Sequence, residues 1–382
     1  MINVNSGGSI NARINKSVAT AISLRHATGM PFIRVRPQDD DLVQQVVDLE
    51  NTAKRVDDPE ADDSIPELVA RGLKYGWDLE PGEKYLYYPE GGDTPLGVLD
   101  IDHPMRDNLQ LVWAGLVVHP DHRRRGHGTA MMEEVLRQTR ELGRSIIWMG
   151  TAEDDLGARA FLERFGFVYS SHDARRFQVL ADVDRAELDR LHREAMAAAS
   201  DYELVRQMSP TPDGILEQLI KVTAAINDAP MGDLVFEDEK FDLQRLKDIE
   251  TASAGTGNRL YRIFARHKIT GEVGGHTVVV TNPLRPTFAG QGDTAVSREH
   301  RGHRLGMLLK IEMMHWLADV EPQLERIETW NHADNTFMIN VNEAIGYRLS
   351  RVFAAFQLLL DQQATTVASA EATKETLTPV GG

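Results

Sequence analysis

Two short basic segments combine arginine with glycine in a way that suits an anion. Each follows a strand pattern that ends in valine, and each opens an apolar helix pattern. The segments consist of Arg123, Arg124, Arg125, Gly126, His127 and Gly128, and of Arg301, Gly302, His303, Arg304, Leu305 and Gly306. Free N–H groups and the helix dipole attract phosphate at a helix start, and glycine permits close backbone approach. We therefore expect two pyrophosphate cradles; a solvated basic turn is the alternative.

The histidines near these segments are not spaced as metal ligands. His119, His122 and His127 accompany the first segment, and His300 and His303 accompany the second. No carboxylate stands at ligand spacing from any of them, and the chain has no cysteine. We therefore expect no metal site.

Composition limits the class of function. The chain has 42 Lys and Arg against 58 Asp and Glu, a net charge of −16 that disfavours nucleic acid and anionic membranes and favours a cationic partner. The absence of cysteine excludes disulfides and thiol nucleophiles, and no apolar leader or long apolar run is present. We expect a soluble, cytoplasmic protein.

The elements that position the two segments repeat along the chain. Apolar periodicities in residues 32–177 predict a strand, two helices, three strands, a helix, a strand, a helix and two strands. Nearly the same order recurs in residues 202–360, and it places Arg301 where Arg123 stands and Gly346 where Gly166 stands. The sequence therefore predicts an α/β (α+β) fold with two tandem domains, each a mixed, mostly antiparallel sheet flanked by helices.

The predicted boundaries follow changes in composition. Residues 1–30 and 362–382 are polar and low in apolar residues, so we expect a flexible extension and a flexible tail. Residues 31–181 form the expected N-terminal domain and residues 201–361 the C-terminal domain. Residues 182–200 between them carry apolar residues at helical spacing, which predicts a connecting helix.

The segments resemble the acyl-CoA pyrophosphate loop of the GNAT N-acetyltransferases, which follows the pattern Q/R-x-x-G-x-G/A. The first segment matches the pattern fully through Arg123, Gly126 and Gly128. In the second, Arg304 replaces the middle glycine, and its Cβ can restrict the turn. The later family pattern N-x-x-A-x-x-x-Y-x-x-x-G-F is matched in part, with Asp155 and Leu162 in the first half and Asn335 and Asn342 in the second.

The resemblance covers residues 31–361 and implies an acetyl-CoA co-substrate. It places a backbone amide of the fourth strand, near Val118 or Val296, against the thioester carbonyl. Asn331 and Asn335 in the second half belong to the implied cofactor-binding set, together with both basic segments. The family's helix tyrosine, its usual acid, is absent from both halves.

The second half carries the residues that we assign to catalysis. An amine with a pKa of about 10.4 needs a base to lose its proton near neutral pH, and Asp293 is the candidate base. A strand-end acid that bonds to backbone is an equally open interpretation of Asp293. Asn342 stands at the tyrosine position, and Gly115 is the counterpart of Asp293 in the first half. We expect catalysis in the C-terminal domain and a degenerate N-terminal domain.

Together these features predict a tandem acetyltransferase that moves an acetyl group from acetyl-CoA directly to an amine of a small, cationic acceptor. A protein that binds CoA without catalysis, or acts as a scaffold, is the alternative from another class. A third interpretation has the two domains only forming a dimer interface; a homodimer is also open for the enzyme.

Overall fold

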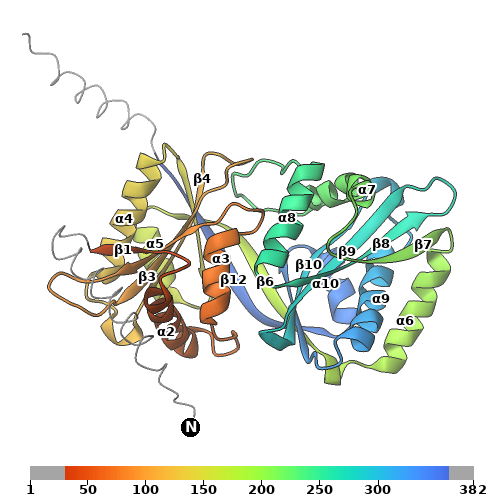
Figure 1. Cartoon of the computed structure of the whole chain (residues 1–382), viewed down its shortest axis with the longest axis horizontal. Coiled ribbons are helices and arrows are strands. Elements are labelled where there is room, and N and C mark those ends of the chain that lie inside the picture. Colours follow the sequence, from red (N-terminus) through yellow and green to blue (C-terminus); the bar gives the residue numbers. More distant parts are fainter. Residues whose placement is uncertain (1–30, 361–382) are drawn as a thin grey trace, which may run out of the picture.

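The computed structural model describes residues 31–360, so the predicted flexible extension and tail lie outside the described residues. The described residues form one twelve-stranded sheet with helices on both faces, and the two halves of the chain lie side by side (Figure 1). Within these residues no helix is long and apolar enough to cross a membrane.

The N-terminal half follows the predicted order of elements. In sequence they are β1 (Phe32–Val35), α2 (Asp40–Asp57), α3 (Pro66–Tyr75), β2 (Glu83–Tyr87), β3 (Gly97–Asp102), β4 (Leu111–Val118), η1 (Pro120–His122), α4 (His127–Glu141), β5 (Ile146–Ala152), α5 (Leu156–Arg164) and β6 (Val168–Val179). The two strands that we predicted near Phe167 and Phe177 are wrong as separate elements. They form the single strand β6, because residues 168–178 pair with the neighbouring strand along their length apart from two register shifts.

The C-terminal half repeats this order after a connecting helix. Its elements are η2 (Leu180–Asp182), α6 (Arg185–Ala198), β7 (Tyr202–Met208), α7 (Asp213–Ala224), η3 (Ala225–Asp228), α8 (Leu243–Gly255), β8 (Arg259–His267), β9 (Val273–Asn282), β10 (Arg285–Val296), η4 (Arg298–His300), α9 (Leu305–Val320), β11 (Arg326–His332), α10 (Thr336–Ala344) and β12 (Tyr347–Leu359). The predicted repeat and the mixed α/β architecture are therefore confirmed.

The connecting helix α6 is present where the sequence predicts it. Asp184 caps its first turn by accepting a hydrogen bond from the backbone N–H of Glu187 at 3.1 Å. Leu188, Leu191 and Ala195 face the same core as the apolar residues of α9. The helix therefore packs on the C-terminal half.

The two sheets join because the halves exchange their last strands. The strand order is β1-β2-β3-β4-β5-β12-β6-β11-β10-β9-β8-β7. Strand β6, from the N-terminal half, pairs with β11, while β12, from the C-terminal half, pairs with β5. Tyr347 at the start of β12 lies in the core beneath α9, and Phe356 near its end lies in the core beneath α4. One strand thus contributes to both cores, and the boundaries at residues 181 and 201 stay a prediction.

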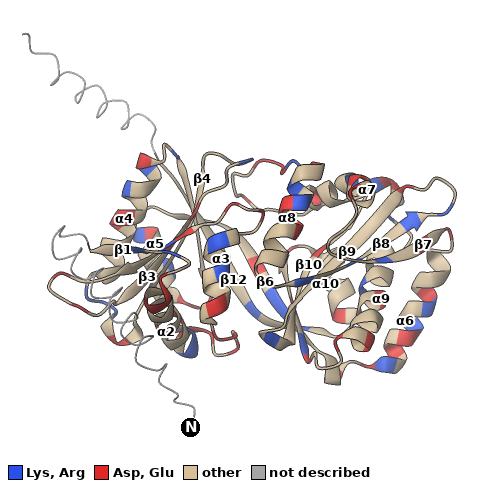
Figure 2. Ribbon diagram, viewed as in Figure 1, with Lys and Arg blue, Asp and Glu red and all other residues tan. Residues whose placement is uncertain are grey.

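Ion pairs also connect the halves. In Figure 2, basic residues (blue) lie along the central strands β6 and β12. Arg351 on β12 binds Asp154 of the N-terminal half at 2.6 Å, and Arg326 on β11 binds Asp62 at 2.9 Å. On α8, Arg245 binds Asp78 and Asp107 of the N-terminal half. The side chains of Arg245 and of these two aspartates are buried, so this contact is shielded from water.

Candidate functional site

A cavity of about 790 Å³ opens where β10 and β11 separate. The two strands pair in parallel only at residues 288–290 and 326–328 and then diverge. Of the site residues predicted in the C-terminal half, His303 and Asn342 do not line this cavity. The others do, and they are Asp293, Val296, Arg301, Gly302, Arg304, Leu305, Gly306, Asn331 and Asn335. The fold therefore brings together a loop, a strand and a helix start that are separate in sequence.

A β-bulge shapes the wall of the cavity at Asp293. Gln291 pairs with Val279 and Thr294 pairs with Thr277, so three steps along β10 oppose two along β9. The Gln291 amide holds this geometry, since its Nε2 donates to the carbonyl oxygen of Val278 at 2.6 Å. The extra residue of a bulge is not paired in the ladder, so backbone groups at this point are free to bind a ligand.

The corresponding strand of the N-terminal half has no bulge. Strand β4 pairs with β3 residue by residue, from Val118 opposite Gly97 to Trp113 opposite Asp102. Gly115 in this strand carries no side chain that could accept a proton. The two halves therefore differ in the backbone as well as in the side chains of this strand.

Asp293 is half-buried, and charged groups on neighbouring elements act on it. Burial raises the pKa of its carboxyl group, and the nearby carboxylate of Glu239 raises it further, while Arg262 opposes the shift. Arg262 on β8 is itself buried and donates from Nη1 to Glu250 at 2.8 Å. Asp293 therefore lies on the side of the sheet that α7 and α8 cover, within a charged environment.

The two basic loops have the same backbone shape but carry different residues. Arg124 and Gly126 have φ values of 62° and 90°, and the equivalent Gly302 and Arg304 have 88° and 54°. Glycine thus occupies the second left-handed position in one loop and the first in the other. The loop forms around Arg304 although it lacks the middle glycine.

The first arginine of each loop is held in an ion pair. Arg301 donates from Nε to the carbonyl oxygen of Val296 at 3.2 Å and binds Asp228 at 2.6 Å. Arg123 makes the equivalent contacts, to the carbonyl oxygen of Val118 at 3.0 Å and to Asp57. These contacts fix each loop to the strand before it, and they fit a structural role for both arginines.

The asparagines of the second half play different parts. Asn335 caps α10 by accepting a hydrogen bond from the N–H of Met338 at 3.2 Å, and Asp155 caps α5 in the same way. Asn342 is completely buried and donates from Nδ2 to Oδ1 of the cavity-lining Asn331 at 2.7 Å. Asn342 therefore reaches the cavity only through Asn331.

Other predicted loop residues contact neighbouring elements through their side chains. Arg304 binds Glu194 of α6 at 2.8 Å. His303 stacks against Tyr202 with ring centroids 5.5 Å apart, and His127 lies 5.7 Å from the ring of Tyr87. The side chains of Arg304, His303, His127 and Arg125 are not buried.

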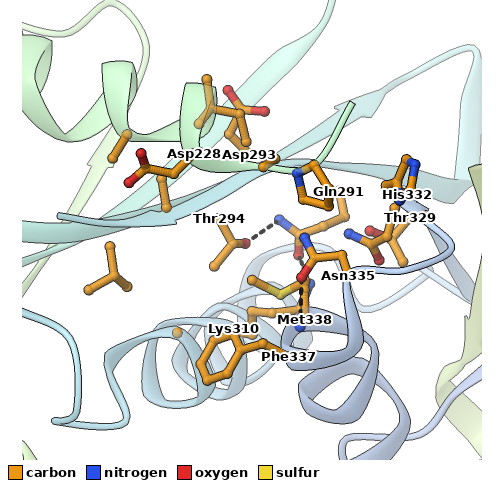
Figure 3. A pocket seen from close by; sticks show the side chains of 18 of the residues that line it. Asp228, Gln291, Asp293, Thr294, Lys310, Thr329, His332, Asn335, Phe337 and Met338 are labelled. Carbon is orange, nitrogen blue, oxygen red and sulfur yellow. Dashed lines mark hydrogen bonds between the residues drawn. The ribbon is translucent and has the colours of Figure 1, made fainter. Parts of the chain in front are cut away.

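Some residues that line the cavity were not predicted from the sequence. Lys310 interrupts the apolar run of α9, which is a signal that could have been noticed. Asp173 comes from β6 of the other half, so only the exchange of strands brings it to this cavity. Lys310, Gln291 and Thr294 are among the cavity-lining residues labelled in Figure 3.

The described residues contain two clusters of histidine and carboxylate side chains. In each cluster the possible ligand atoms lie within 4.8 Å of one another. The clusters are His172, His332 and Asp334, and His192, Glu312 and His315. Neither group contains the loop histidines considered from the sequence, and the expectation of no metal stays a prediction.

A segment of the C-terminal half lies over the region of the N-terminal half that corresponds in the fold to the cavity. Phe236 packs on Trp148 of β5 with ring centroids 5.4 Å apart, beside the point where β4 and β5 diverge. Asn108 holds this segment by exchanging hydrogen bonds with the backbone of Glu237, and Gln357 binds its start. The equivalent region of the C-terminal half is the open cavity.

Comparisons with known proteins agree with this geometry. The family model for the acetyltransferase (GNAT) family matches residues 43–167. Mycothiol acetyltransferase from Saccharomonospora viridis is 27% identical over 315 residues, which are 77% of this chain and 92% of that protein.

Solved structures show the same arrangement. A tandem GNAT protein from the clavulanic acid biosynthesis pathway matches with a TM-score of 0.71 and 25% identity, over 86% of this chain and 98% of the other. A GCN5-related N-acetyltransferase from Sphaerobacter thermophilus matches with a TM-score of 0.59 and 14% identity, over 86% and 96% of the two chains. The second likeness concerns the fold alone.

Proposed function

Because this chain is an acetyltransferase of the GNAT family with two such domains in tandem, we propose that its C-terminal half transfers the acetyl group. The donor is acetyl-CoA, and the acceptor is the amine of a small cationic molecule. The observation that carries the proposal is the bulge in β10, which presents Asp293 and unpaired backbone to the cavity. The N-terminal strand β4 has neither the bulge nor a carboxylate at that place.

The loop before α9 supports the position of the donor. Gly302, Arg304 and Gly306 line the cavity at the helix start, where N–H groups and the dipole favour the pyrophosphate. A Cβ added to Gly306 would meet no atom within 4 Å, so space for a phosphate is present beside it. The N-terminal loop has the same shape, and we propose that it binds CoA without transferring an acetyl group.

The cavity supplies the groups that amide formation requires. The backbone amides of β10 near Val296 would polarise the thioester carbonyl by donating a hydrogen bond. Asp293 would accept the proton of the attacking amine, and its raised pKa makes it a better base than an exposed aspartate. Asn342 would act through Asn331, which it holds in place.

The charge of the molecule supports a cationic acceptor. The chain carries a net charge of −16, and Asp293 and Glu239 add negative charge near the cavity. Attraction between unlike charges raises the association rate and weakens as salt screens it. Turnover of a cationic acceptor at low concentration should therefore fall with rising salt, whereas turnover of a neutral acceptor should not.

Matched substitutions in the two loops test which half acts. Gly306→Asp places a carboxylate in the first turn of α9, which favours the helix dipole but repels a pyrophosphate. We expect this variant to lose thiol release from acetyl-CoA in the presence of a polyamine acceptor, and Gly128→Asp to retain it. Calorimetric titration with acetyl-CoA should show one site fewer in each variant. Loss of turnover in Gly128→Asp alone would place the chemistry in the N-terminal half.

A further inference from the structure

Lys310 is a buried lysine at the floor of the cavity that the proposed function does not yet use. It projects from α9, only 2% of its surface is exposed, and it lines the cavity (Figure 3). Its Nζ donates to Oε1 of Gln291 at 3.1 Å and lies 4.9 Å from the ring centroid of Tyr347. An ammonium group has three donors, so Nζ keeps donor capacity beyond the bond to Gln291.

No ion pair holds Lys310 among the described residues. Tyr347 is the titratable group that faces it from β12, and the facing groups of β9 and β10, Thr277 and Gln291, are neutral. The titratable residues that α6 and β8 direct toward α9 have partners other than Lys310. His192 binds Glu312, Glu194 binds Arg304, and Tyr261 binds Glu321. Burial without a counter-charge lowers the pKa of Lys310 to about 7. The group can therefore gain and lose a proton near neutral pH.

Lys310 and Asp293 lie on opposite faces of the sheet. Gln291, which Lys310 contacts, pairs with Val279, and Val279 belongs to the core beneath α9. Asp293 has Arg262 and Glu239 as its charged neighbours, on the face that α7 and α8 cover. A reaction centre between β10 and β11 would have one proton acceptor above it and one proton donor below it.

The helix α10 does not supply that donor. Asn342, at the position of the family's helix tyrosine, is completely buried, does not line the cavity and does not titrate in the accessible pH range. Met338, one turn earlier, lines the cavity with an apolar side chain.

We propose that Lys310 is the general acid that protonates the departing thiolate of the acyl donor. This inference rests on the proposed function. The acceptor nitrogen bonds to the thioester carbonyl carbon, the C–S bond breaks with its electron pair on sulfur, and sulfur takes a proton from Nζ of Lys310. Asp293 takes the proton that the amine loses, and exchange with water resets both groups.

Binding of CoA and desulfo-CoA to the full chain tests this placement without an identified acceptor. The two ligands differ only at the sulfur, so the ratio of their dissociation constants measures how much contacts with the sulfur contribute to affinity. We expect the wild type to bind CoA roughly tenfold more tightly at pH 7.5, because one bond to a charged group contributes about that much. Lys310→Met should reduce the ratio to about twofold and leave the affinity for desulfo-CoA unchanged.

Two further variants separate this role from a structural one. Lys310→Gln keeps a polar contact to Gln291 but cannot protonate sulfur, so its ratio should also collapse. Lys247→Met, on the exposed side of α8, should keep the wild-type ratio. Lys310→Met should not lower the thermal unfolding midpoint, since it relieves the burial of an amine.

The outcomes distinguish this inference from the proposed function. Equal affinities of the wild type for CoA and desulfo-CoA, or an unchanged ratio in Lys310→Met, would overturn the role of Lys310 while leaving acetyl transfer intact. Failure of the wild type to bind either ligand would instead overturn the proposed function.

Discussion

At the scale of single residues, the surroundings of a side chain matter more than its type. Asp293 and Asp228 both line the cavity, but their environments differ. Hydrogen bonds from Arg298 and Arg301 lower the pKa of Asp228, whereas burial raises the pKa of Asp293. Of these two aspartates, Asp293 is therefore the one suited to take a proton from an amine.

Replacing Asp293 by Asn should separate activity from stability. We expect kcat/KM to fall about 10²- to 10⁴-fold, the contribution of a positioned base. The activity of the wild type should decline as pH falls through the raised pKa of Asp293, and that acidic limb should vanish in Asp293→Asn. A pH–rate profile measures both effects.

We expect the Asp293→Asn variant to be at least as stable as the wild type, although it is less active. When the pKa of a carboxyl group is higher in the folded chain than in the unfolded chain, the unfolding free energy of the protein falls as pH rises from the unfolded pKa through the folded pKa. Asp293→Asn removes this cost, so urea unfolding at pH 7 should show an equal or higher unfolding free energy. A marked loss of stability would mean that Asp293 is a structural residue.

At the scale of elements, the backbone of the basic loop accepts more than one residue pattern. Both loops need two left-handed positions, and each half places its glycine at a different one. An L-residue other than glycine pays a steric cost at such a position, which arginine bears at residues 124 and 304. The turn therefore forms in this chain without a glycine at the middle position of the family pattern.

Substitutions in the C-terminal loop test this interpretation. Gly302→Ala introduces a Cβ at a φ of 88° and should cost about 1–2 kcal/mol of unfolding free energy. Arg304→Gly should leave the unfolding free energy unchanged or higher and should preserve acetyl-CoA binding, because the left-handed backbone is retained. Urea unfolding and calorimetry measure the two effects. Weaker acetyl-CoA binding in Arg304→Gly would show that the Arg304 side chain, and not the backbone, binds the donor.

At the scale of the whole molecule, the two halves form one structural unit. Each half completes the other's sheet through β6 and β12, and β12 contributes to both cores. The buried Arg245 adds contacts across the halves, to Asp78 at 3.2 Å and to Asp107. We therefore expect the halves to unfold together.

Arg245→Met should destabilise both halves at once. Removing the cation leaves the buried carboxylate of Asp107 without a cationic partner and leaves Asp78 only a longer contact to Arg106. Breaking a buried pair in this way costs about 3–5 kcal/mol. Trp77, Trp113 and Trp148 report on the N-terminal half and Trp316 and Trp330 on the C-terminal half. With one set replaced by Phe, fluorescence should give the same urea midpoint from either half, lowered equally by Arg245→Met. Separate midpoints would contradict a single cooperative unit.

The sequence by itself determined the elements and the repeat. Period and turn signals are local, so the helices and strands occur in nearly the predicted order along each half of the chain. The basic loops and Asp293 were also found from the sequence, since loop, strand and helix start adjoin in the chain. The C-terminal loop and Asp293 line one cavity, and the roles of these residues in binding and catalysis stay predictions.

Only the tertiary structure decided how the halves meet. Exchange of β6 and β12 depends on which sheet edge each strand finds, and the residues of a strand do not specify its partner. The same packing brings Asp173 to the cavity, places Phe236 on Trp148 and buries Lys310 without a counter-charge. The properties that make this site particular arise from burial and from long-range contacts, which a linear pattern does not encode.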